Sequence, residues 1–181
     1  MKDVEALIRG AKLPERVVPV CMRPDLQAEW ERLDRELDKA RSLSLDSIEG
    51  GATLRALAER LKALEAEMAE STVEFKLRAM PRPAWKAFLL AHPPRKGEDG
   101  KVLERDAYVG VDVDAFFPAL VRRCTISPQL SDELWQLLLD EKLTDRQFDD
   151  LSNAAWALNR GEVDVPFSRA ASRILENSES E

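Results

Sequence analysis

The side chains of this sequence that could perform chemistry are few, and their spacing matches no catalytic pattern. His92 is the single histidine, so neither a histidine pair for zinc nor a Ser-His-Asp arrangement can be assembled. The sequence contains no glycine-rich phosphate loop and no nucleophile elbow. Cys21 and Cys124 lie far apart without metal or disulfide spacing, as expected of core residues in a reducing compartment. We therefore expect no catalytic residue, no metal ligand and no cofactor.

The acidic residues leave one enzymatic alternative open. Asp112 and Asp114, together with Asp149 and Asp150, could hold a hard cation for a metal-dependent reaction. Asp112 and Asp114 stand immediately before an apolar helical pattern, however, and this position favours helix capping. His92 lies between an alanine and two prolines, and we expect it to cap or pack at a helix end.

The composition indicates a folded protein that is well solvated. The 181 residues are 44% hydrophobic and 34% charged, which suits one domain with a core or a core with a smaller satellite. A net charge of -7 disfavours nucleic acid and anionic membranes as partners. No apolar run is long enough to cross a bilayer, and the N-terminus does not look like a signal peptide. We expect a cytoplasmic protein.

Two stretches of heptad-like spacing predict an antiparallel helical hairpin. Apolar residues recur every three or four positions over residues 26–40 and again over 54–68, with a break at 42–52. Each apolar stripe needs a partner, and the nearest one is the other arm. The same stripes could instead lie along a helix of another protein. On that interpretation the partner-binding residues are Trp30, Leu33 and Leu37 on the first arm and Leu57, Leu61 and Leu64 on the second.

Short strands are predicted on both sides of the hairpin. Residues 17–22 are β-branched and contain Pro19, which suits only an edge strand. Residues 73–79 alternate apolar and charged side chains, the pattern of a half-buried strand. We hypothesise that these two strands pair and bring the base of the hairpin together.

The remainder of the chain predicts further helices and a polar tail. The chain is thus predicted to be mainly α: an antiparallel helical hairpin flanked by two short strands, followed by a small helical bundle and a flexible C-terminal tail. Its regions are 1–95 (strand, helical hairpin, strand, helix), 96–111 (a charged, glycine-containing linker), 112–161 (helical, with a Thr144–Gln147 capping box) and 162–181 (tail). Pro166 and Phe167 are the tail residues with the character of a docking segment, although a loosely packed end explains them equally well.

The order of these features resembles the tail assembly chaperones of long-tailed bacteriophages, particularly those that infect actinobacteria. The likeness covers most of residues 15–172 and rests on the patterns above and on short phrases, none of which is an enzymatic signature. The phrases are Phe75–Leu77, a Pro-Arg-Pro-x-Trp helix that ends in His92-Pro93-Pro94-Arg95, Phe116–Leu120, Leu143–Phe148, Ala157–Gly161 and Val165–Ser168.

The resemblance implies a non-enzymatic assembly factor in the host-cell cytoplasm. Such a chaperone binds the tape measure protein, keeps it soluble, and is displaced when tail tube protein polymerises around the client. The family commonly has a longer form made by ribosomal frameshifting, and this chain would be the shorter product. The sequence leaves open a homo-oligomer, and also the alternative of a structural or connector protein that stays in a phage-like assembly.

Overall fold

The computed structural model describes residues 3–43 and 48–161, and it confirms a mainly helical protein with a small antiparallel sheet. The elements in chain order are α1 (Val4–Gly10), β1 (Glu15–Cys21), α2 (Leu26–Leu43), α3 (Ile48–Glu70), β2 (Thr72–Arg78), α4 (Arg82–Leu90), α5 (Glu104–Val109), α6 (Val113–Cys124), β3 (Thr125–Ser127), α7 (Asp132–Leu137), the π-helical turn η2 (Leu138–Lys142) and α8 (Asp145–Arg160).

The sheet has the strand order β1-β2-β3 and is antiparallel throughout. β1 and β2 pair over their whole length, with Val18 opposite Phe75, so the hypothesis of paired strands at the base of the hairpin is confirmed. β3 was not predicted, because its three residues directly follow α6 and are too few to show alternation. It joins β2 through Lys76 and Leu77.

Pro19 occupies the free edge of the sheet, as its residue type predicts. Hydrogen bonds link Ala79 to Pro14 and Met22 to Ser71 at the two ends of the β1–β2 register. Residues of β1 bond to β2 at every second position, so Pro19 belongs to the set that faces away from β2. A proline there removes a free N–H donor from the exposed edge, which opposes the addition of another strand.

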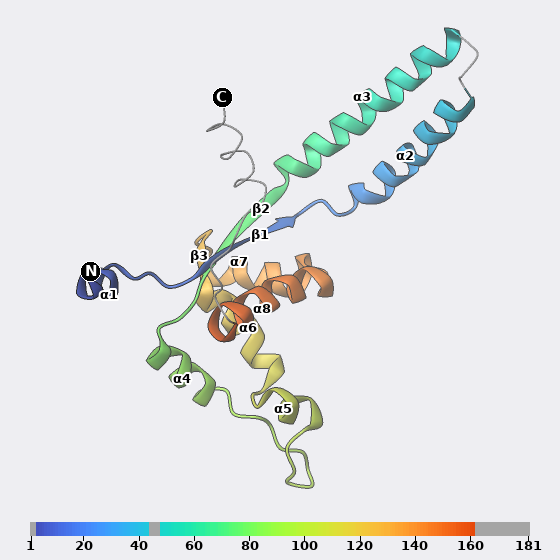
Figure 1. The fold of residues 1–181 in the computed structure, drawn as a ribbon. Helices are drawn as coiled ribbons and strands as arrows, with labels where there is room; N and C mark the ends of the chain where they lie inside the picture. The colour runs from blue at the N-terminus through green and yellow to red at the C-terminus, as the bar shows by residue number, and fades with distance from the viewer. Residues whose placement is uncertain (1–2, 44–47, 162–181) are drawn as a thin grey trace.

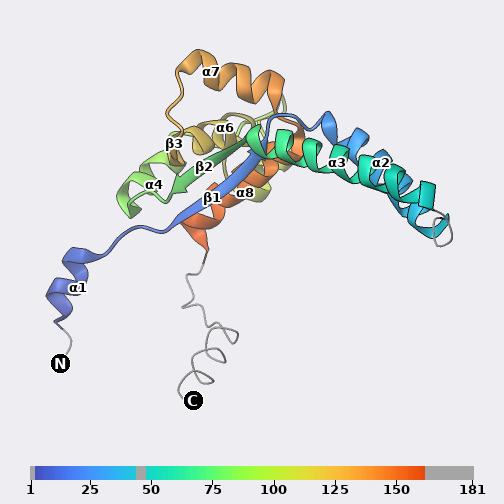
Figure 2. The same cartoon turned by 90° about the horizontal axis from the view of Figure 1, so that it is seen from above.

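The helical hairpin projects from one end of the sheet, whereas α1 lies beyond the other end of β1 (Figures 1 and 2). The seam of the hairpin, where α2 and α3 contact each other, is an apolar cluster that is separate from the main core around the sheet. The buried members of this cluster are Leu26, Leu33, Leu61 and Leu64. An ion pair of 2.8 Å between Arg60 and Glu29 also crosses from one helix to the other at the surface.

The main core lies between the sheet and helices α6, α7 and α8. Phe75 and Leu77 of β2 are 1% and 0% exposed, and they pack with Phe116 and Leu120 of α6 and Leu151 of α8, which are fully buried. Strands from the first predicted region and helices from the region 112–161 therefore share one core.

An aromatic cluster fastens α4 to this core. Trp85 of α4 makes edge contacts with Phe116, at 5.9 Å between ring centroids, and with Trp156 of α8, at 5.7 Å. The His92 ring lies tilted against the Phe88 ring, with 4.6 Å between the ring centroids, and its Nδ1 lies 2.9 Å from the Phe88 carbonyl oxygen. The prediction that His92 packs at a helix end is confirmed.

Candidate protein-binding surfaces

The predicted partner-binding leucines of the hairpin lie mostly in its seam. Leu33 and Leu61 are each 6% exposed and Leu64 is fully buried, so a partner could contact these three side chains only if α2 and α3 separated. Leu37 and Leu57 are half-buried at the margins of the seam. The stripes that resemble a docking surface are thus largely satisfied within the chain.

Trp30 is partly accessible beside the seam. A shallow pocket of about 340 Å³ is lined by Gln27, Trp30, Glu65 and Met68. The indole N–H of Trp30 donates to the Glu65 carboxylate at 3.4 Å, and Lys62 approaches the other Glu65 oxygen at 2.6 Å. The hydrogen bond from Lys62 is the main cause of a lowered Glu65 pKa. Trp30 therefore links the two arms and remains partly exposed in this pocket. Pro166 and Phe167, the other predicted partner-binding residues, lie outside the described residues.

A more open surface depends on residues 96–111, the predicted linker. This segment contains helix α5, and the buried carboxylate of Asp106 holds that helix in place. Asp106 is 0% exposed and accepts hydrogen bonds from the Arg95 backbone N–H at 2.8 Å, from the Arg95 guanidinium at 2.9 Å and from the Val113 N–H at 3.3 Å. Hydrogen bonding to Arg95 is the main cause of an Asp106 pKa well below its usual range. The pair ties α5 to the start of α6.

Two neighbouring carboxylates extend this network. Asp112 caps α6 by accepting the N–H groups of Asp114 and Ala115, which confirms the expected capping, and it also lies 3.1 Å from Arg95. Asp114 binds Arg95 at 2.6 Å and Arg105 at 3.0 Å. Both acids are therefore engaged by guanidinium groups or backbone amides.

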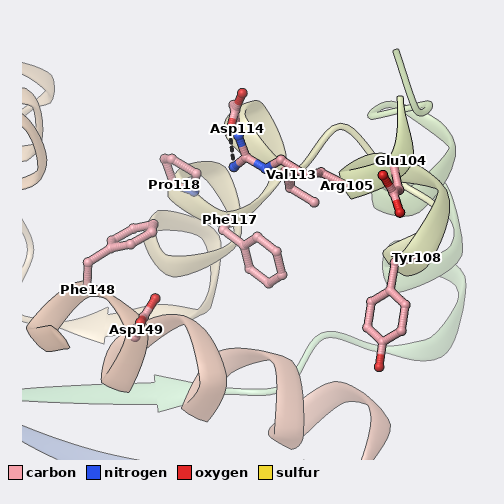
Figure 3. Close-up of a pocket in the computed structure, with 9 residues that line it drawn as sticks. All are labelled: Glu104, Arg105, Tyr108, Val113, Asp114, Phe117, Pro118, Phe148 and Asp149. Atoms are coloured by element: carbon pink, nitrogen blue, oxygen red, sulfur yellow. Dashed lines mark hydrogen bonds and ion pairs between the residues drawn. The ribbon is translucent and has the colours of Figure 1, made fainter. Parts of the chain in front are cut away.

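An open groove of about 740 Å³ lies between α5, α6 and α8 (Figure 3). Its lining consists of Glu104, Arg105, Tyr108, Val113, Asp114, Phe117, Pro118, Phe148 and Asp149. The rings of Tyr108, Phe117 and Phe148 follow the groove from one end to the other in Figure 3. Tyr108 is 95% exposed, whereas Phe117 and Phe148 are half-buried and form the floor.

The floor of the groove is anchored to the core. The Phe117 ring packs edge-on against Phe116 at 5.3 Å and lies 5.9 Å from Trp156. The sequence does not indicate the groove, because Tyr108 falls in the predicted linker 96–111 and because Phe117 and Phe148 belong to two separate helices. The sequence signal that could have indicated the groove is the single tyrosine within a charged segment.

The groove lining carries three aromatic rings together with four charged side chains. In the part of the chain that the structure describes, no three side chains of His, Cys, Asp or Glu gather as a metal site requires. Asp150, the fourth acid of the metal-enzyme alternative, pairs with Arg146 at 3.3 Å. What the groove offers is aromatic surface with carboxylates at the rim.

Two further apolar surfaces are exposed. A pocket of about 190 Å³ lies among β2, α7 and η2, where Leu134 and Leu137 are 50% and 39% exposed. Helix α1 has no buried residue, and its apolar side chains Val4, Leu7 and Ile8 are 63%, 59% and 71% exposed.

Among residues 3–43 and 48–161, no helix combines the length and the apolar character needed to cross a bilayer.

Comparison with known proteins found no matching family model, no matching curated protein and no matching solved structure.

Proposed function

We propose that this protein is a non-enzymatic assembly chaperone that binds a helical client and keeps it soluble. The observation that carries the proposal is the open aromatic groove between α5, α6 and α8, because it presents Tyr108, Phe117 and Phe148 without a catalytic constellation beside them. Aromatic side chains on an accessible concave surface are characteristic of protein interfaces.

The resemblance to phage tail assembly chaperones supplies the identity of the client. On this proposal the client is the tape measure protein, the complex forms in the host cytoplasm, and the chaperone leaves when tail tube protein assembles. The acidic balance of the chain supports the role, since a net charge of -7 helps to keep a complex with an apolar client in solution. Many copies bound along one long client would hold it firmly even if each contact were weak.

Co-expression tests the proposal directly. On this proposal a tape measure protein is encoded next to this chain, and that protein should gain soluble yield several-fold when the two are produced together. Tyr108→Ser should reduce that gain, whereas Leu90→Ser, which removes a 73% exposed apolar side chain from α4, should not. Unchanged precipitation of the client beside the unaltered chain rejects the proposed function.

The exposed apolar face of α1 favours a second candidate, a structural or connector protein. Val4, Leu7 and Ile8 on a helix that lies beyond the end of the sheet could fasten the chain to a neighbouring subunit (Figure 2). Mass spectrometry of purified particles separates the two roles. A connector is present at fixed stoichiometry, and a chaperone is absent from the finished particle.

A further inference from the structure

The groove between α5, α6 and α8 combines aromatic surface with a negative rim, and this combination specifies what can bind there. Its three walls are helices, and the lining residues belong to α5, α6 and α8 alone. No strand edge borders the groove, so an extended peptide would find no backbone ladder to join. A helix can instead pack its side chains between those of the surrounding helices.

The floor requires an apolar stripe on the bound helix. Phe117 and Phe148 are half-buried, and Tyr108 extends the aromatic surface out into solvent. The volume of about 740 Å³ falls within the range of about 300–1,000 Å³ that is typical of ligand-binding pockets. Side chains at positions i, i+3, i+4 and i+7 of a helix would lie along the three rings.

The rim requires positive charge beside that stripe. Arg105 is held by Asp114, and Asp114 is shared with Arg95, so these charges are already balanced. Glu104 and Asp149 line the same groove, and within the described residues neither takes part in an ion pair. The charge available to a partner is therefore negative.

We propose that this groove binds an amphipathic helix of the client whose apolar stripe is flanked by Lys or Arg. The inference rests on the proposed function and narrows it, since it names the chemistry of the client segment and the surface that receives it. Tyr108, Phe117 and Phe148 contact the stripe, and Glu104 and Asp149 pair with the flanking cations.

Two fluorescein-labelled peptides test the chemistry on the full chain: LKKLLKLLKKLLKL, which is basic, and LEELLELLEELLEL, which has the same leucine stripe with acidic flanks. By fluorescence anisotropy in low salt, the basic peptide should bind at least about tenfold more tightly than the acidic one. Glu104→Lys with Asp149→Lys should weaken the basic peptide about tenfold and strengthen binding of the acidic peptide. Tyr108→Ser should weaken both peptides.

The matched control changes net charge equally at another place. Glu70→Lys with Glu74→Lys alters two exposed carboxylates that form no ion pair in the described part of the chain, one at the end of α3 and one on β2. This variant should leave the affinity for both peptides within about twofold. Equal weakening by the control and the groove variant would mean that net charge alone attracts the basic peptide, and the proposal would be overturned.

The chain's own C-terminal segment is the competing occupant. Residues 167–175 place Phe167, Ala170, Ala171, Ile174 and Leu175 at helical spacing with Arg169 and Arg173 between them, and they lie outside the described residues. If Arg169→Ser with Arg173→Ser makes the basic peptide bind more tightly, this segment occupies the groove and the assignment to a client is overturned. Unchanged affinity supports the client.

Failure of this inference is distinguishable from failure of the proposed function. If the Glu104→Lys, Asp149→Lys chain keeps the co-expressed tape measure protein soluble as well as the unaltered chain does, the negative rim does not receive the client, so this inference fails and the chaperone function stands. If the unaltered chain leaves the client insoluble, the function fails whatever the peptides do.

Discussion

At the scale of single residues, Asp106 determines the conformation of a whole segment. Its buried carboxylate accepts hydrogen bonds from both sides of the segment, from Arg95 at one end and from Val113 at the other. A charged group can be buried only when hydrogen bonds and an opposite charge replace its hydration, and Arg95 supplies both. The position of α5, and with it one wall of the groove, depends on this pair.

Asp106→Asn should therefore loosen α5. The amide keeps the size of the side chain but removes the charge that balances Arg95, so the melting temperature should fall by at least about 4 °C. Amide hydrogen exchange should accelerate over residues 95–113 more than in α8. Glu98→Gln, an exposed carboxylate in the same segment, provides the control and should change neither measurement. Equal exchange in both variants would contradict the assigned role.

The same carboxylate predicts the response to acid. The pKa of Asp106 is lower in the folded chain than in the unfolded chain, chiefly because of the hydrogen bond from Arg95. Asp106 therefore contributes stability above the unfolded pKa of about 3.9, and that contribution is lost as the pH falls through the folded pKa. In urea titrations the unaltered chain should exceed Asp106→Asn in free energy of unfolding by the most above about pH 5. This difference should shrink below about pH 4. A constant difference across this range would contradict the linkage.

Local residue signals predict some of these roles and miss others. The caps at Asp112 and at Thr144 with Gln147 are confirmed, since a cap is a relation between residues two or three positions apart. The Arg95–Asp106 pair joins residues eleven positions apart in a segment of mixed charge, and no periodicity identifies it. Trp30 and the five leucine positions of the hairpin remain predictions as binding residues, and burial restricts what Leu33, Leu61 and Leu64 can contact.

At the scale of elements, the hairpin is stabilised by its leucine seam. Each long helix has one apolar stripe, and the two stripes bury each other, as heptad spacing predicts. The strands were predictable for a similar reason, because β2 alternates clearly between apolar and charged residues. The elements that the sequence did not reveal are β3, with three residues, and α5, with six, both too short for a period to be recognised.

Leu64→Ala should destabilise the hairpin strongly. Leu64 is fully buried, and removing a buried leucine side chain costs about 2–5 kcal/mol when the cavity does not collapse. Leu7→Ala makes the same chemical change on α1, where the side chain is 59% exposed, and should cost less than about 0.5 kcal/mol. Hydrogen exchange of the α2 and α3 amides reports the difference. A similar effect of both substitutions would mean that the seam is not a packed core.

At the scale of the whole molecule, two separate apolar clusters divide the described chain into the hairpin and a body. The hairpin has its own cluster, and β1 and β2 on either side of it belong to the core formed with α6, α7 and α8. The hairpin is thus an insertion between two adjacent strands of the body. The sequence predicts the insertion and the helices. It does not show that residues far apart in the chain, such as Val18 and Leu151, belong to one core.

This organisation predicts that the body folds without the hairpin. Met22 and Ser71 are linked by a backbone hydrogen bond of 2.9 Å. Two residues that are paired in this way can be connected directly by a two-residue β-turn. Replacement of residues 23–70 by Asn-Gly should therefore leave β1 and β2 joined in a tight hairpin. The near-ultraviolet circular dichroism of Trp85, Trp135 and Trp156 should persist, with one cooperative unfolding transition. Loss of that signal would show that the helical insertion is required for the body to fold.

The direct connection between α3 and β2 has a mechanical consequence. Ser71 alone separates the end of α3 from the start of β2, so the helix continues the course of the strand with almost no intervening chain. Its 23 residues extend about 34 Å at 1.5 Å per residue. A rotation of about 10° where the sheet twists would swing the distant tip through about 6 Å. Any rotation of the body at this junction would therefore displace the outer end of the hairpin more than the sheet itself, and a pair of dyes on the outer half of α3 and on α8 would report that displacement.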